Sequence, residues 1–340
     1  MDLSTFWFSL IAVLWIGYFV LEGFDFGVGV LVGTMSDDDT DRRVVINTIG
    51  PVWDGNEVWL ITAGGATFAA FPEWYATLFS GFYLPLLAIL VALIVRGVAF
   101  EYRGKVDTLA WRRGWDRAIF WSSALPALLW GVAFANIVRG VPLDADFEFT
   151  GSLLDLLSPY ALLGGLVTLS LFCLHGAVFV SLKTDGEVRH RARGIAQRLA
   201  PVALLLAGGF LVWTQVITGN AGSMVLAAAG ALCLVAATLL VRTPREGWAF
   251  AATAATIALA VASLFVALFP DVLPSTVAGN SLTVDNASSS PYTLKVMTWV
   301  AAFGTPLVVT YQAWTYWVFR QRISRKHIVG APAGEPTPVP

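Results

Sequence analysis

Charged side chains are scarce in this sequence. Asp, Glu, Lys and Arg make up 13% of its 340 residues, whereas about a quarter is usual in a soluble domain. Cysteine is rarer still, and Cys173 and Cys233 both lie inside apolar blocks, so neither a disulfide framework nor a cysteine metal site is expected. The net charge is -2 and the sequence has no basic tract, so no nucleic-acid partner is expected. Together these shortages exclude a soluble globule.

Apolar residues supply 57% of the chain and fall in long blocks, and about 20 such residues cross a bilayer. The blocks lack the alternation of barrel strands, so helices must satisfy the backbone in lipid. We expect an all-α integral membrane protein with about nine transmembrane helices, arranged as two helical bundles plus a final helix. The nine predicted spans are 6–33, 52–71, 75–98, 117–137, 158–182, 201–218, 222–241, 248–269 and 296–319.

The first block is too long for a signal-peptide core and lacks a basic segment before it, so we expect it to remain as the first helix. Residues 1–326 are predicted to form a single polytopic domain. Residues 327–340 are rich in Pro and Gly and are predicted to be a disordered cytoplasmic tail.

Lys and Arg are distributed unevenly between the predicted loops. Of the 21 in the chain, all but Arg139 and Lys295 fall in segments that would share one side of the membrane. Because basic loops stay in the cytoplasm, the amino terminus is predicted to lie outside and the carboxyl terminus inside.

Four carboxylates interrupt the first two spans: Glu22, Asp25, Asp54 and Glu57. An acid at the centre of a membrane helix costs roughly 2.5–3.5 kcal/mol on insertion scales, and such residues usually mark proton or ion pathways. Each pair is spaced three residues apart and therefore shares a helix face. We interpret them as a proton route, with Arg96 as the candidate counter-charge and Asp116 as a further polar neighbour. Two alternatives remain open: the acids reach the headgroups, or Asp54 caps its helix beside Pro51.

The chain is poor in haem ligands. Haem iron needs axial His, Met or Cys, but His175 is the only His within a predicted span, and the four Met are scattered. We therefore interpret His175 as a packing residue and assign no catalytic, cofactor-binding or metal residue to this chain. The residues alone indicate a proton-handling or scaffolding subunit.

Several motifs follow one another in a recognisable order. The first is Leu-Glu-Gly-Phe-Asp-Phe-Gly-Val-Gly at 21–29, followed by Asp-Arg-Arg-Val-Val-Ile-Asn at 41–47 and by the segment 51–65, which begins Pro-Val-Trp-Asp-Gly-Asn-Glu. Phe-Glu-Tyr-Arg at 100–103 and Met-Thr-Trp at 297–299 come later. With these motifs the chain resembles subunit II of cytochrome bd-type quinol oxidases from its first span to its last.

The resemblance implies a heterodimer in the bacterial cytoplasmic membrane. Subunit I would carry the haem b and haem d groups and oxidise quinol, and dioxygen would be reduced to water with protons taken from the cytoplasm. The family also leaves room for small accessory subunits and for a bound quinone in subunit II.

By motif, Asp54 corresponds to a proton-entry carboxylate and Trp59 to an aromatic residue near an oxygen entrance. Asp25, Arg96 and Asp116 match polar positions associated with the integrity of the oxidase. Val52 and Glu57 depart from residues found in some members, which puts the local proton chemistry in question. His175 also departs from the residue of some members, which weakens any ligand role for it. The competing hypotheses are a proton-coupled secondary transporter and a purely structural partner of a haem subunit.

Overall fold

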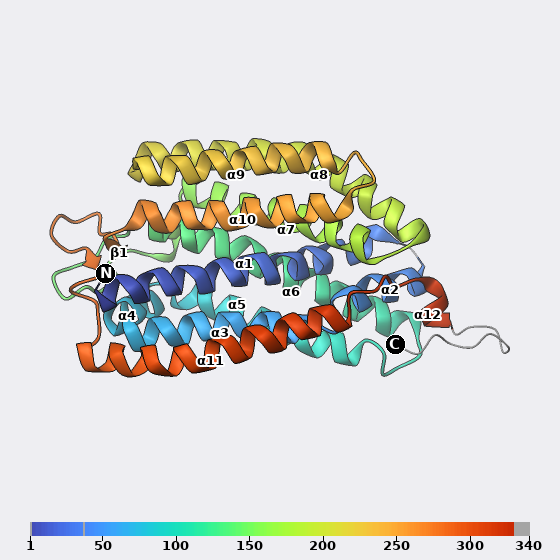
Figure 1. Cartoon of the computed structure of the whole chain (residues 1–340), viewed down its shortest axis with the longest axis horizontal. Coiled ribbons are helices and arrows are strands. Elements are labelled where there is room, and N and C mark those ends of the chain that lie inside the picture. Colours follow the sequence, from blue (N-terminus) through green and yellow to red (C-terminus); the bar gives the residue numbers. More distant parts are fainter. Residues whose placement is uncertain (1, 37, 330–340) are drawn as a thin grey trace.

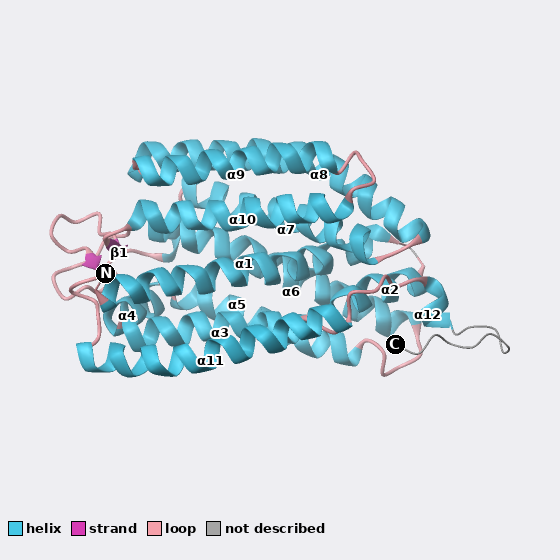
Figure 2. Cartoon of the chain, viewed as in Figure 1, coloured by secondary structure: helices cyan, strands magenta, loops and turns pink. Residues whose placement is uncertain are grey.

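Long helices dominate the computed structural model, which describes residues 2–36 and 38–329 (Figures 1 and 2). The α-helices are α1 (Leu3–Met35), α2 (Asp39–Ile49), α3 (Trp53–Ala70), α4 (Pro72–Gly81), α5 (Tyr83–Tyr102), α6 (Leu109–Arg139), α7 (Pro159–Lys183), α8 (Gly186–Thr218), α9 (Ala221–Leu240), α10 (Glu246–Leu268), α11 (Pro291–Val318) and α12 (Arg325–Val329). A 3-10 helix, η1 (Leu153–Leu157), and two short antiparallel strands, β1 (Asp271–Leu273) and β2 (Leu282–Thr283), lie in loops. The all-α prediction is confirmed.

Eight helices of the described residues are long and apolar enough to cross a membrane: α1, α5, α6, α7, α8, α9, α10 and α11. The chain is thus a multi-pass membrane protein. Each of the nine predicted ranges overlaps a helix. The range 52–71 falls on α3, which carries Asp54 and Glu57 and is not among the eight. The count of nine therefore stays a prediction.

The predicted span 75–98 is divided between two helices. α4 ends at Gly81, Phe82 makes a turn, and α5 begins at Tyr83. Pro85 is the third residue of α5. A continuous helix would need a backbone N–H at Pro85 to bond Gly81, and proline has none.

Two groups of helices share a broad interface. One group contains α1 and α3–α6, the other contains α7–α10, and α7 packs on both α1 and α6. Glycines allow the closest approach between α1 and α7, since a Cβ on Gly27 would lie 1.8 Å from the carbonyl oxygen of Phe172. This close contact explains why Gly27 of the motif at 21–29 cannot carry a side chain.

The final helix, α11, lies at the edge of the molecule against α1 and α3 (Figure 1). Leu294 is its only buried residue. After α11 the chain continues along the end of the molecule that carries α2 and α12, called the Arg-rich end below. There Ile323 forms a β-bridge with Thr184, and Arg325 of α12 pairs with Asp38. His327–Val329 of the predicted tail belong to α12, and residues 330–340 lie outside the described residues.

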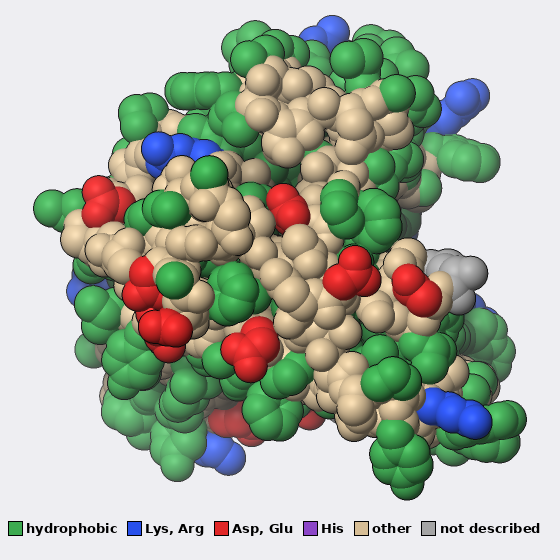
Figure 3. Space-filling model, turned by 90° about the vertical axis from the view of Figure 1, so that its left-hand side faces the viewer, with side chains coloured by type: hydrophobic (Ala, Val, Ile, Leu, Met, Phe, Trp, Pro, Cys, Tyr) green, Lys and Arg blue, Asp and Glu red, His purple; other side chains and the backbone are tan. Residues whose placement is uncertain are grey.

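The two ends of the molecule differ in character. Figure 3 shows the end that carries the amino terminus and β1, where several acidic side chains and a few Lys and Arg side chains are visible. The loop between α10 and α11 is ordered there, and Asn280 donates to the Leu143 carbonyl at 2.9 Å. α2 and α12 lie at the opposite end (Figure 1). The positive-inside rule places that opposite end in the cytoplasm, and this orientation stays a prediction.

Candidate functional site: buried carboxylates between α1, α3 and α5

Glu22 and Asp25 lie well inside α1, and both side chains are fully shielded from solvent. Arg96 of α5 is equally buried and forms an ion pair with Glu22. Its guanidinium also lies over two aromatic rings, 4.8 Å from the centre of Phe26 and 5.3 Å from that of Phe100. The planar, delocalised guanidinium suits such a stacked and paired position. Arg96, proposed from sequence as the counter-charge, therefore lies beside the acids.

Asp25 is held by an amide from α3. Asn56, also fully buried, donates from Nδ2 to Asp25 Oδ2 at 2.7 Å. The Asn56 Oδ1 atom accepts two hydrogen bonds from α11, from Tyr316 Oη at 2.7 Å and from Gln312 Nε2 at 3.2 Å. The sequence analysis missed these three residues. The signal was available, because Gln312 and Tyr316 are four residues apart and form a polar stripe on the final helix.

Asp54 and Glu57 lie at the start of α3. Asp54 is exposed and Glu57 is half-buried. Among the described residues, neither side chain has a hydrogen-bond or ion-pair partner. Val52 is the N-cap of α3, which has no side-chain capping hydrogen bond. Asp54 therefore does not cap the helix, and that alternative is wrong.

Trp59 faces away from Asp54, toward α11 and α1. Its indole N–H donates to Gln312 Oε1 at 2.7 Å. The ring covers Gly17, where a Cβ would lie 2.2 Å from the indole. Trp59 is thus a half-buried, hydrogen-bonded packing residue in this chain.

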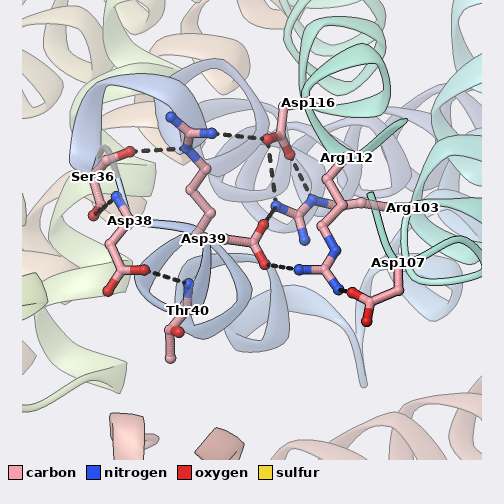
Figure 4. Close-up of polar contacts among 9 residues, drawn as sticks. Ser36, Asp38, Asp39, Thr40, Arg103, Asp107, Arg112 and Asp116 are labelled. Atoms are coloured by element: carbon pink, nitrogen blue, oxygen red, sulfur yellow. Dashed lines mark hydrogen bonds and ion pairs between the residues drawn. The ribbon is translucent and has the colours of Figure 1, made fainter. Parts of the chain in front are cut away.

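Asp116 belongs to a separate ionic cluster at the Arg-rich end (Figure 4). It accepts from Arg103 Nε at 2.6 Å and from Arg42 Nη1 at 3.3 Å. Arg103 and Arg112 each bind Asp39, both at 2.7 Å. The cluster joins α2 to the end of α5 and the start of α6. The sequence analysis proposed Asp116 as a polar neighbour of the buried acids. That prediction is wrong, because Asp116 lies in this separate cluster.

Comparison with known proteins decides the family. The model of the cytochrome bd terminal oxidase subunit II family matches residues 3–319. The chain belongs to that family. Subunit 2 of cytochrome bd ubiquinol oxidase from Bacillus subtilis (strain 168) is 44% identical over 332 residues, covering 96% of this chain and 98% of the relative. Subunit 2 of cytochrome bd-I ubiquinol oxidase from Escherichia coli (strain K12) is 38% identical over 361 residues and covers 95% of both chains.

The fold has a solved counterpart as well. A chain in the structure of bd oxidase from Geobacillus thermodenitrificans matches with a TM-score of 0.78 at 18% identity, covering 94% of this chain and 99% of that one. The chain is thus subunit II of a bd-type terminal oxidase in a bacterial membrane, part of a quinol-oxidising complex. The transporter hypothesis is not favoured.

His175, the one histidine within a predicted span, does not fit an axial haem ligand. His175, fully buried, uses both ring nitrogens: Nδ1 lies 2.7 Å from Thr253 Oγ1 and Nε2 lies 3.2 Å from the Val20 carbonyl oxygen. Its ring stacks on Phe250 at 4.6 Å. Within residues 2–36 and 38–329, no three His, Cys, Asp or Glu side chains gather as a metal site. Cys173 and Cys233 are free thiols.

Proposed function

We propose that subunit II supplies the oxidase with a proton route that starts at Asp54 and continues through Glu57 to Asp25 and Glu22. One observation carries this proposal: two carboxylates buried in the membrane domain lie across a helix interface from two more accessible ones. Ionisable groups are expensive in lipid and are retained mainly for function. Reduction of dioxygen to water consumes protons, which a route of this kind would deliver from the cytoplasmic side.

The partner in this proposal is subunit I, which would ligate haem b and haem d and oxidise quinol. The apolar outer face of α3 and α11 is suited to receive it. Ile61 and Phe68 on α3 and Phe303 and Leu307 on α11 are all strongly exposed, and α11 makes few contacts within this chain. Small accessory subunits and a bound quinone are further expectations from the family.

Asp54→Asn tests the proton route, because it keeps the shape and removes the titrating group. The assembled, haem-replete complex should turn over more slowly, with the largest loss at high pH, where protons are scarce. The measurement is quinol-dependent oxygen consumption from about pH 6 to about pH 9, the range in which buried carboxyls are known to titrate. Normal turnover of Asp54→Asn throughout that range would remove Asp54 from the route.

The same experiment distinguishes the proton route from the hypothesis that subunit II is a purely structural partner. A subunit that only stabilises subunit I would lose assembly or haem content when damaged, and its assembled variants would keep a normal pH profile. Haem content per complex, measured optically beside turnover, distinguishes a defect in assembly from a defect in proton delivery.

A further inference from the structure

A chain of hydrogen bonds runs from α3 to α11, back to α3 and on to α1. It links Trp59, Gln312, Asn56 and Asp25 in that order, and Tyr316 joins it at Asn56. Trp59 and Asn56 are three residues apart on α3, so they present the same side to α11. This series of hydrogen bonds ends at the Asp25 carboxylate, which belongs to the proposed proton route.

Trp59 sets the direction of this chain because an indole nitrogen can only donate. Gln312 must therefore turn its Oε1 to Trp59, which leaves its NH2 group for Asn56. Asn56 must in turn offer Oδ1 to Gln312, and Tyr316 donates to the same oxygen at 2.7 Å. The Asn56 NH2 group is then left to face Asp25, where it donates at 2.7 Å.

The reverse orientation is unfavourable at every link. A flipped Gln312 would set its NH2 group against the indole N–H and its oxygen against Asn56 Oδ1. A flipped Asn56 would set its oxygen against Asp25 Oδ2. Each clash leaves buried or half-buried polar groups unpaired, and an unpaired buried group costs more than an average hydrogen bond contributes.

We infer that Trp59, Gln312 and Tyr316 are positioning residues that lock the Asn56 amide as a donor to Asp25 Oδ2, so that Asp25 binds and releases its proton at Oδ1. Oδ1 makes no hydrogen bond to the described residues. The charged groups that interact with Asp25 are Glu22, on its own helix, with Glu57 of α3 and Arg96 of α5; Tyr316 faces it from α11. This inference rests on the proposed proton route through Asp25.

The test uses the purified, haem-replete complex and three variants: Trp59→Phe, Gln312→Met and Tyr316→Phe. Trp59→Phe and Tyr316→Phe each remove one hydrogen bond, Gln312→Met removes two, and none of the three adds a charge. A donor stabilises the ionised carboxylate. Without a locked donor, the limb of the pH–turnover profile that reports Asp25 should move to higher pH by about one unit. Trp248→Phe on α10 and Tyr292→Phe on α11 are matched controls, because both side chains are largely exposed and their pH profiles should be unchanged.

Infrared spectroscopy gives a readout that does not depend on turnover. The carbonyl band of protonated Asp25, identified as the band lost in Asp25→Asn or displaced in Asp25→Glu, should move to higher frequency in Gln312→Met, because Oδ2 loses a steady donor. The double variant Trp59→Phe/Gln312→Met should shift the band and the pH profile no further than Gln312→Met alone, since Trp59 acts on Asn56 through Gln312.

The outcomes separate the two proposals. If Asp25→Asn alters the pH profile while Gln312→Met and Tyr316→Phe leave both the profile and the band in place, the positioning inference is wrong and the proton route stands. If Asp25→Asn assembles with a normal pH profile, the proton route through Asp25 is wrong. Additive shifts in the double variant would also overturn the positioning chain.

Discussion

Arg96 on α5 and Glu22 on α1 form an ion pair in which both side chains are completely shielded from solvent. Desolvation of two charges is expensive, so such a pair contributes little net stability compared with an apolar pair. Losing one partner is different, because it leaves a single charge buried. The pair therefore ties the assembly of α1 and α5 to the presence of both residues.

Arg96→Met should accordingly destabilise the complex by about 3–5 kcal/mol. The double variant Glu22→Gln/Arg96→Met should recover much of that loss, because neither member of the pair is left without its partner. Thermal unfolding of the purified complex and the yield of assembled oxidase measure the loss in the single variant and its recovery in the double variant. Equal losses in the single and double variants would show that packing over Phe26 and Phe100 matters more than charge balance.

The ionic cluster of Asp116 should also be needed for stability. Asp116→Asn removes the negative charge and one of the two oxygen acceptors that Arg103 and Arg42 share, and hydrogen bonds to charged groups contribute about 1.5–3 kcal/mol each. The measurement is the unfolding midpoint of the complex. Asp107→Asn is the matched control: its side chain pairs with Arg112 but is 92% exposed, so the change should be within about 0.5 kcal/mol. Equal effects of the two variants would show that the ionic cluster of Asp116 is not needed for stability.

Trp59 offers a test of oxygen entry, the role suggested by the family resemblance. If Trp59 guides dioxygen, Trp59→Leu should change the oxygen concentration needed for half-maximal turnover, since a smaller apolar side chain alters the lining. Gln312→Met is the control, because it cuts the hydrogen bond of Trp59 and keeps the ring. Unchanged turnover of Trp59→Leu at limiting oxygen would leave Trp59 with its packing and positioning contacts only.

An apolar cavity of about 70 Å³ lies between α1 and α6–α10, lined in part by Gly208, Leu234 and Ile257. A Cβ at Gly208 meets no atom within 4 Å, and the same holds for Gly209, which does not line the cavity. Gly208→Leu and Gly209→Leu should each raise the free energy of unfolding by about 0.5–1 kcal/mol, because leucine has a higher helix propensity than glycine. Gly208→Leu should gain more by filling space. The unfolding midpoints of the two variants test this, and a larger rise for Gly209→Leu would contradict it.

His175 should have no part in haem binding. Subunit II expressed without its partner should show no stoichiometric Soret absorption, because haem iron needs a free axial ligand and both ring nitrogens of His175 form hydrogen bonds. His175→Gln in the complex should lower stability and keep the haem content. A full haem complement in the isolated subunit that disappears in His175→Ala would overturn the assignment.

The sequence by itself determined the class of protein, the family and the positions of most helices. Hydrophobic runs mark membrane helices because lipid offers the backbone no hydrogen-bond partner, and that information is local. Even the break between α4 and α5 was readable at Pro85, although the sequence analysis ran through it. The buried acids also stood out locally, since each is a charge within an apolar run.

Only the tertiary structure decided which side chains meet. Asp116 lies among arginines in the sequence, but only the tertiary structure shows that its partners are Arg42 of α2 and Arg103 at the end of α5. Asn56 and Gln312, 256 residues apart, meet because α11 lies against α3. Such contacts depend on how helices cross and on their axial register, and neither is written in the periodicity of a single helix.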